Sequence, residues 1–127
     1  MNVPVFLSVA QVQRLHQVAL ERFGGMEGVR EQGLLESAVM QPQHVFYYAQ
    51  GDLFQIASAY AYHLAENQPF IDGNKRTAAG AVIVFLRLNN VDTDFDSMKL
   101  HAAMISIAEK QMNKEELADL LRQITSE

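Results

Sequence analysis

Apolar residues recur at helical spacing along most of the chain. In the first segment they stand three or four positions apart, at Val12, Leu15, Ala19 and Phe23. This spacing places them on one face of a helix. Ser8 and Gln11 form a capping-box pattern before the segment, and Gly24-Gly25 follows it. The sequence therefore predicts a helix from about residue 8 to residue 23.

A second, shorter helix is predicted by a cluster of apolar residues. The cluster consists of Leu34, Leu35, Ala38 and Val39. We expect this helix to end before Pro42, because proline lacks the amide hydrogen that a helix interior needs and disfavours helical geometry in the residue before it. Pro4, Pro42 and Pro69 would all mark helix boundaries.

Two strongly apolar segments stand in the middle of the chain. Asp52 with Gln55 repeats the capping-box pattern, and residues 53–64 are apolar on nearly every face. After a loop over residues 67–73, residues 75–88 form another strongly apolar segment that ends at Asn89-Asn90. Helices that are apolar all round are surrounded by other elements. We therefore expect a central buried helix pair.

Two more helices complete the predicted fold. Asp96 or Ser97 can cap one that runs through Ile107, and Asn113 with Glu116 can cap the last. In the last helix the inward-facing residues are Leu117, Leu120, Leu121 and Ile124. No segment alternates convincingly as a strand, so the sequence predicts an all-α domain of about six helices.

Composition narrows the classes of function. The 127 residues are 49% hydrophobic and 20% charged, which is typical of one globular domain over 1–127. A net charge of -5 excludes a global positive field for nucleic acid or an anionic membrane. The longest apolar run, 78–86, falls short of the roughly 20 residues of a membrane span, and the first eleven residues make a poor signal peptide. Together with the absence of cysteine, this favours a cytoplasmic protein.

The polar segment 68–77, between the two central helices, suggests chemistry. Lys75 and Arg76 fall in the first turn of a helix, where free amides already carry partial positive charge, so an anion would stabilise this turn. Gly73 would let the backbone approach that anion, and Arg76 can donate to two oxygens. The segment therefore predicts a phosphate site, with a solvated basic pair as the alternative.

Three other residues of this segment each have two interpretations. Asp72 is either a ligand of Mg²⁺, together with phosphate oxygens and water, or a helix N-cap. Asn74 is either a cap or a donor to phosphate. For Phe70 we favour a core anchor of the loop over a platform for base stacking.

The segment resembles the signature of the Fic/Doc family, His-x-Phe-x-Asp/Asn-Gly/Ala-Asn-Lys/Gly-Arg. The matching residues are Phe70, Asp72, Gly73, Asn74, Lys75 and Arg76. The resemblance covers nearly the whole chain and is strongest to the death-on-curing (Doc) branch, through Leu15-His16, Arg22-Phe23-Gly24-Gly25, Gly33-Leu34-Leu35-Glu36-Ser37-Ala38 and Phe85-Leu86-Arg87-Leu88-Asn89. It implies a Fic/Doc-like domain that acts as the toxin of a toxin-antitoxin pair.

The resemblance also implies a reaction and its participants. Asp72 would hold Mg²⁺, and ATP would bind Phe70, Gly73, Asn74, Lys75 and Arg76. Lys75 resembles the Doc branch, whose members transfer a terminal phosphate to a protein hydroxyl, whereas relatives that transfer AMP usually carry glycine there. The implied partners are a translation elongation factor, by similarity to kinases of elongation factor Tu, and a small antitoxin that folds into a groove as a helix. Val3, Val5 and Phe6 either serve that groove or belong to a tucked-in terminus.

Gln68 departs from the family pattern, which places its general-base histidine at this position. Glutamine cannot accept a proton at any useful pH, and a missing base typically costs on the order of 10²- to 10⁴-fold in rate. We therefore expect a weak or inactive enzyme, or a catalytically silent module that binds nucleotide or antitoxin. Gln68 is compatible with a histidine substituted to allow production of a growth inhibitor and with a natural lineage of lost or altered activity.

The four histidines offer no replacement for the missing base. His63 is five residues upstream, about 140° around a helix, and should face elsewhere. We expect His16 to be a hydrogen-bonded structural residue between helices, and His44 and His101 to lie at the surface. The four tyrosines, Tyr47, Tyr48, Tyr60 and Tyr62, are interpreted as packing residues.

Overall fold

The computed structural model describes residues 2–126, so Met1 and Glu127, the ends of the predicted domain, lie outside the described residues. The described chain is all-α, as predicted, and apart from six helices it contains one isolated β-bridge between Val29 and Phe70. The helices are α1 (Val9–Phe23), α2 (Gln32–Ala49), α3 (Leu53–Asn67), α4 (Asn74–Leu88), α5 (Ser97–Ala108) and α6 (Lys114–Thr125).

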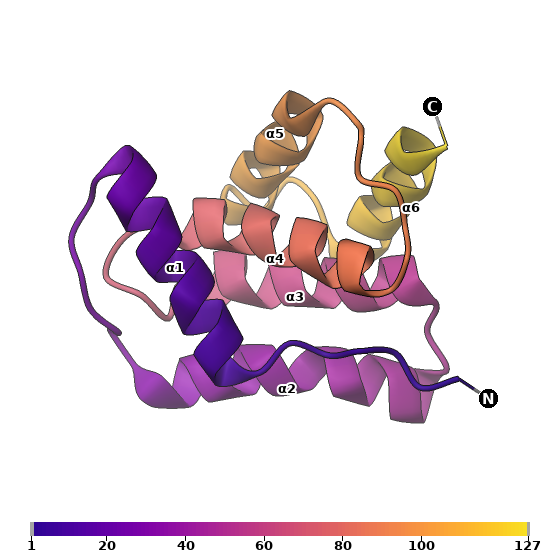
Figure 1. Cartoon of the computed structure of the whole chain (residues 1–127), viewed down its shortest axis with the longest axis horizontal. Coiled ribbons are helices and arrows are strands. Elements are labelled where there is room, and N and C mark those ends of the chain that lie inside the picture. Colours follow the sequence, from indigo (N-terminus) through magenta and orange to yellow (C-terminus); the bar gives the residue numbers. More distant parts are fainter. Residues whose placement is uncertain (1, 127) are drawn as a thin grey trace.

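The helices α3 and α4 form the predicted central pair (Figure 1). Helix α2 packs against α3, α1 packs against α4, and α5 and α6 pack against the pair from another side. Both central helices bury side chains on most of their surface, from Ile56 to Ala65 and from Thr77 to Leu86. The loop between them is therefore held at both ends by the most buried elements of the fold.

The predicted helix starts are confirmed by their caps. Ser8, Asp52 and Asn113 each form both halves of a capping box, and the Asp96 side chain accepts a hydrogen bond from the amide of Met98. These side chains satisfy amides that have no acceptor inside their own helices. Four of the six helices thus begin where local hydrogen bonding predicts.

The predicted end of the second helix is wrong. Helix α2 continues to Ala49, with Pro42 inside it and buried. An interior proline costs about 3 kcal/mol or more, but the apolar stripe of α2 continues through Pro42 to Val45 and Phe46, and its burial offsets that cost. The stripe beyond Pro42 was the sequence signal for the longer helix.

The N-terminal segment is tucked against the helices. The amide of Val5 donates to Asn89 Oδ1 at 2.8 Å, and Asn89 Nδ2 donates to the carbonyl oxygen of Val5 at 3.0 Å. Phe6 packs against the rings of Phe46, Tyr47 and Phe85. Of the two interpretations of this segment, the structure favours the tucked-in terminus. Among the described residues, no helix has both the length and the apolar character needed to cross a bilayer.

Candidate functional site

The start of α4 carries unsatisfied backbone donors. Gly73 is its N-cap residue, with φ 78°, and no side chain of the described residues caps the first turn. The first bond of the helix runs from the amide of Thr77 to the carbonyl oxygen of Gly73, at 3.0 Å. The amides of residues 74–76 precede this bond and therefore stay available to a ligand.

Asp72 lies beside this helix start but does not cap it. Its Oδ1 accepts from the amide of Gly73 at 2.9 Å, and its Oδ2 accepts from the amide of Met26 at 3.2 Å. The N-cap interpretation of Asp72 is therefore wrong, because the side chain bonds to the cap residue and to a distant segment. Gly25 makes this approach possible, since a Cβ on Gly25 would lie 2.9 Å from Asp72 Oδ2.

The side chain of Asn74 braces the loop. Its Oδ1 accepts from the amide of Phe70, and its Nδ2 donates to the carbonyl oxygen of Phe70, both at 3.0 Å. The cap interpretation of Asn74 is therefore wrong. The ring of Phe70 is 1% exposed and stacks on His16, with centroids 3.8 Å apart and planes 7° apart. Phe70 is a core anchor, as we favoured.

Lys75 and Arg76 are exposed on the α5 side of the site. The Arg76 guanidinium lies over the ring of Phe23, with Cζ 3.7 Å from the centroid. Both residues line a cavity of about 430 Å³ together with Phe23, Ser97, Met98, His101 and Ile105. His44 is exposed as expected, and His101, also expected at the surface, is half-buried and lines this cavity.

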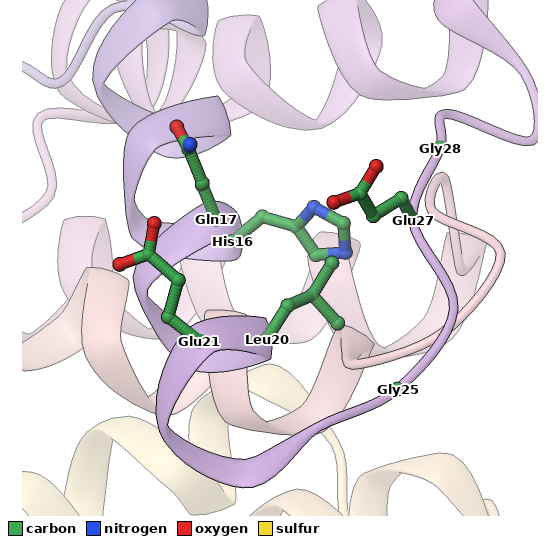
Figure 2. A pocket seen from close by; sticks show the side chains of 7 residues that line it. All are labelled: His16, Gln17, Leu20, Glu21, Gly25, Glu27 and Gly28. Atoms are coloured by element: carbon green, nitrogen blue, oxygen red, sulfur yellow. The ribbon is translucent and has the colours of Figure 1, made fainter.

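A second cavity of about 360 Å³ lies between α1 and the segment 25–28 (Figure 2). It is lined by His16, Gln17, Leu20, Glu21, Gly25, Glu27 and Gly28. His16, 6% exposed, is the structural histidine we expected, since its Nε2 lies 2.8 Å from the carbonyl oxygen of Asp72. The cavity of about 360 Å³ is thus lined by two carboxylates, Glu21 and Glu27, whereas the cavity of about 430 Å³ is lined by two cations, Lys75 and Arg76.

Gln68 stands at the C-cap of α3 in the left-handed conformation, with φ 48° and ψ 59°. Its carbonyl oxygen accepts from Arg30 Nε and that of Asn67 accepts from Arg30 Nη2, each at 2.8 Å. The amide of Arg30 also donates to the carbonyl oxygen of Pro69 at 2.7 Å. Sequence reasoning missed Arg30, whose signal was a cation following the glycine-rich segment 24–28.

His63 does not replace the missing base. It lies against α6, where its Nε2 accepts a hydrogen bond from Lys114 Nζ at 3.1 Å. Burial, and then the charge of Lys114, lower the pKa of His63 to about 4. The prediction that His63 faces away from residue 68 agrees with this placement. The described residues also contain no group of three or more histidine, aspartate or glutamate side chains able to hold a metal ion.

The part of the chain that matches a known protein family runs from α1 into α4 and includes the loop between α3 and α4. Residues 6–86 match the model of the Fic/DOC family. The chain belongs to the Fic/Doc family. This Fic/Doc chain is 32% identical over 119 residues to "Protein kinase doc" of Escherichia phage P1, across 93% of this chain and 94% of that protein. It is 38% identical over 100 residues to "Toxin Doc" of Mycolicibacterium smegmatis, across 76% of this chain and 77% of that protein. The predicted Doc branch is confirmed.

Proposed function

We propose that this Fic/Doc chain is a toxin-type transferase that moves a phosphate from Mg²⁺-ATP to a hydroxyl of a protein, and that Gln68 leaves it weak or inactive. The observation that carries the proposal is the uncapped start of α4, which Asp72 and Gly73 precede and whose first turn contains Lys75 and Arg76. The names of the two relatives, a protein kinase and a toxin, support the same class of activity.

The phosphates of ATP fit the donors at the start of α4. The amides of residues 74–76 and the side chains of Lys75 and Arg76 would bind them, because anions are stabilised by free amides and by the positive end of the helix dipole. Gly73 leaves the approach free of a side chain. Phe70 and the amide group of Asn74 would contribute indirectly, by holding the loop in place.

Asp72 fits the requirements of a Mg²⁺ ligand. Each of its carboxylate oxygens accepts one backbone hydrogen bond, which leaves lone pairs free, and the residue is exposed. Mg²⁺ is commonly held by one or two carboxylates together with phosphate oxygens and water. When bound, the ion would neutralise charge on the phosphates. The chain's own part is to hold the carboxylate rigidly through Gly73 and Met26.

The transfer itself needs a proton acceptor. A bond forms between the hydroxyl oxygen of the target and the γ-phosphorus, the bond from that phosphorus to the bridging oxygen breaks, and ADP leaves. The hydroxyl proton must pass to a base, and Gln68 cannot take it. Because positioning and charge carry most of phosphoryl transfer, the expected loss is on the order of 10²- to 10⁴-fold and not complete.

The decisive experiment restores a histidine at residue 68. Gln68→His is expected to label a protein target from γ-labelled ATP with Mg²⁺, and to arrest growth on expression. Label from α-labelled ATP would instead indicate AMP transfer. Gln50→His is the matched control, because Gln50 is also a left-handed C-cap glutamine, at the end of α2. If neither label appears with Gln68→His, the transferase proposal fails.

The alternative is a catalytically silent module that binds nucleotide or antitoxin, which the absence of a base at Gln68 favours. Calorimetry separates the two functions. The silent module predicts equal ATP affinity in the parent and in Gln68→His, without product from either. The transferase predicts product from the histidine variant.

The proposed partners follow from the same family. We infer a small antitoxin, a translation elongation factor as protein substrate, and action in the cytoplasm. An apolar groove of about 380 Å³ between α1 and α4, lined in part by Leu15, Ile83 and Val84, offers a place for an antitoxin helix. Growth arrest by Gln68→His that a coexpressed antitoxin does not relieve would contradict this part of the proposal.

A further inference from the structure

Arg30 closes the end of α3 from outside the helix. Its guanidinium donates to the carbonyl oxygens of Asn67 and Gln68, and its amide donates to that of Pro69. One residue thus binds three consecutive carbonyl groups around the position where the family places its base. We propose that Arg30 is a positioning residue that fixes the side chain at position 68 toward the bound nucleotide. This inference rests on the proposed transferase function.

A side chain is needed to hold the end of α3 because the residue after Gln68 is Pro69. Helix α2 also ends in a left-handed glutamine, Gln50, but there the next amide, that of Gly51, donates back to the carbonyl oxygen of Val45 at 3.0 Å. This backbone closure is the usual way to hold a left-handed helix end. The corresponding residue after Gln68 is Pro69, which has no amide hydrogen. The end of α3 therefore cannot be closed in this way by its own backbone.

The left-handed conformation of Gln68 adds to the requirement. A residue with a Cβ is disfavoured there by roughly 1–2 kcal/mol, and such conformations persist where the surroundings hold them. The planar guanidinium of Arg30 holds its two donors in a fixed fork, whereas the donors of an ammonium group rotate about a single nitrogen. Arg30 therefore sets both the backbone angle at residue 68 and the direction in which its side chain leaves the chain.

The segment that contains Arg30 also fixes the position of residue 68 relative to Asp72. Its segment is bonded to the loop at two further points, from the amide of Met26 to Asp72 Oδ2 and from the amide of Ile71 to the carbonyl oxygen of Gly28 at 3.0 Å. The base position and the proposed Mg²⁺ ligand are thus held by one short segment. Catalysis by a base depends on such placement, because a shift of about 1 Å can cost on the order of 100-fold.

The test uses the Gln68→His protein. Adding Arg30→Gln is expected to lower kcat about tenfold to hundredfold while the Kd for ATP stays within about twofold. Arg30→Lys keeps the charge without the planar fork, so its kcat is expected to lie between that of the Gln68→His protein and that of the Arg30→Gln variant. This variant also keeps the test valid if Arg30→Gln does not fold. Arg14→Gln is the matched control, since Arg14 is exposed on α1 and its guanidinium donates to the side chain of Gln17, one turn along the same helix. It should leave kcat unchanged.

A second measurement separates this inference from the proposed function. In the Gln68→His protein, NMR should show one set of contacts between the imidazole ring at residue 68 and the loop, and Arg30→Gln should average or abolish it. If Gln68→His transfers no phosphate, the proposed function fails while the NMR comparison still reports on Arg30. Unchanged ring contacts in the Arg30 variants, or an unchanged kcat, would overturn the positioning role.

Discussion

His16 and Asp72 are joined across 56 positions of sequence, since Nε2 of His16 lies 2.8 Å from the carbonyl oxygen of Asp72. Because a carbonyl oxygen only accepts, Nε2 must carry the proton in this contact. The same ring stacks on Phe70. His16 therefore holds the loop at two points, through its ring face and through its edge, and links α1 to the segment that precedes α4.

Replacing His16 should loosen this loop. His16→Ala is expected to lower the free energy of unfolding by about 2 kcal/mol, because it removes a buried hydrogen bond and the packing against Phe70. Urea denaturation measures the change. His44→Ala is the control, since His44 is exposed on α2 and makes an edge-on ring contact with Tyr48 on the same helix. Equal stability of the two variants would mean that the His16 contacts contribute nothing net.

The close approach of Gly25 to Asp72 gives a second prediction. A methyl group on Gly25 would meet Asp72 Oδ2 at 2.9 Å and Leu20 Cδ2 at 3.0 Å, so Gly25→Ala should displace the carboxylate and weaken Mg²⁺-dependent ATP binding at least several-fold. Calorimetry with and without Mg²⁺ measures it.

Gly24→Ala is the matched control for that experiment. Gly24 also has a positive φ, of 77°, but a Cβ there meets nothing within 4 Å. Both variants place a side chain at a positive φ and so introduce backbone strain, but only Gly25→Ala adds the steric conflict with Asp72. A similar loss of ATP affinity in both would assign the effect to backbone strain and not to the carboxylate.

Local signals predicted most of the fold. The capping boxes at Ser8, Asp52 and Asn113 located three helix starts, because each cap is formed by residues within one turn. The same reasoning failed at Pro42, where burial of a long stripe against α3 outweighs a local preference. Local patterns thus predicted the helices and most of their starts. Where a local preference opposes burial against another helix, as at Pro42, tertiary packing determined where the helix ends.

The site was only partly predictable for a related reason. Lys75 and Arg76 were found because their charge conflicts with the helix start that they occupy. The contacts of Arg30 and Gly25 join two irregular segments more than 35 positions apart. Pairing of this kind produces no periodic pattern in the sequence, so the sequence could not predict it. The orientation of Asp72 was missed for the same reason, since Oδ2 accepts from Met26, which no spacing rule connects to it.

His63 gives a prediction of pH dependence. Its pKa in the folded protein is lowered to about 4, from an ordinary value of 6.5, chiefly by burial and then by Lys114. The unfolded chain therefore binds a proton more readily between these values, so stability is full above about pH 6.5 and falls as the pH drops toward 4. Thermal unfolding across this range should show the fall.

The matched variants for His63 are His63→Gln and His44→Gln. His63→Gln should flatten the slope of stability between pH 6.5 and 4, whereas the exposed His44 should leave it unchanged. Lys114→Met should reduce the slope partly, because it removes the weaker of the two causes. A slope that survives His63→Gln would place the acid sensitivity in other groups.

The contact between Arg76 and Phe23 leads to the last prediction. With the guanidinium 3.7 Å over the ring, Phe23 restricts the side chain that is proposed to bind phosphate. An exposed cation–π contact contributes about 0.5–1 kcal/mol, so Phe23→Leu should weaken ATP binding about twofold to fivefold. Stability should change little, since Phe23 is 59% exposed. Tyr48→Leu, another exposed aromatic residue on a different helix, should leave ATP affinity unchanged. Tighter binding by Phe23→Leu would show instead that the ring competes with the nucleotide for Arg76.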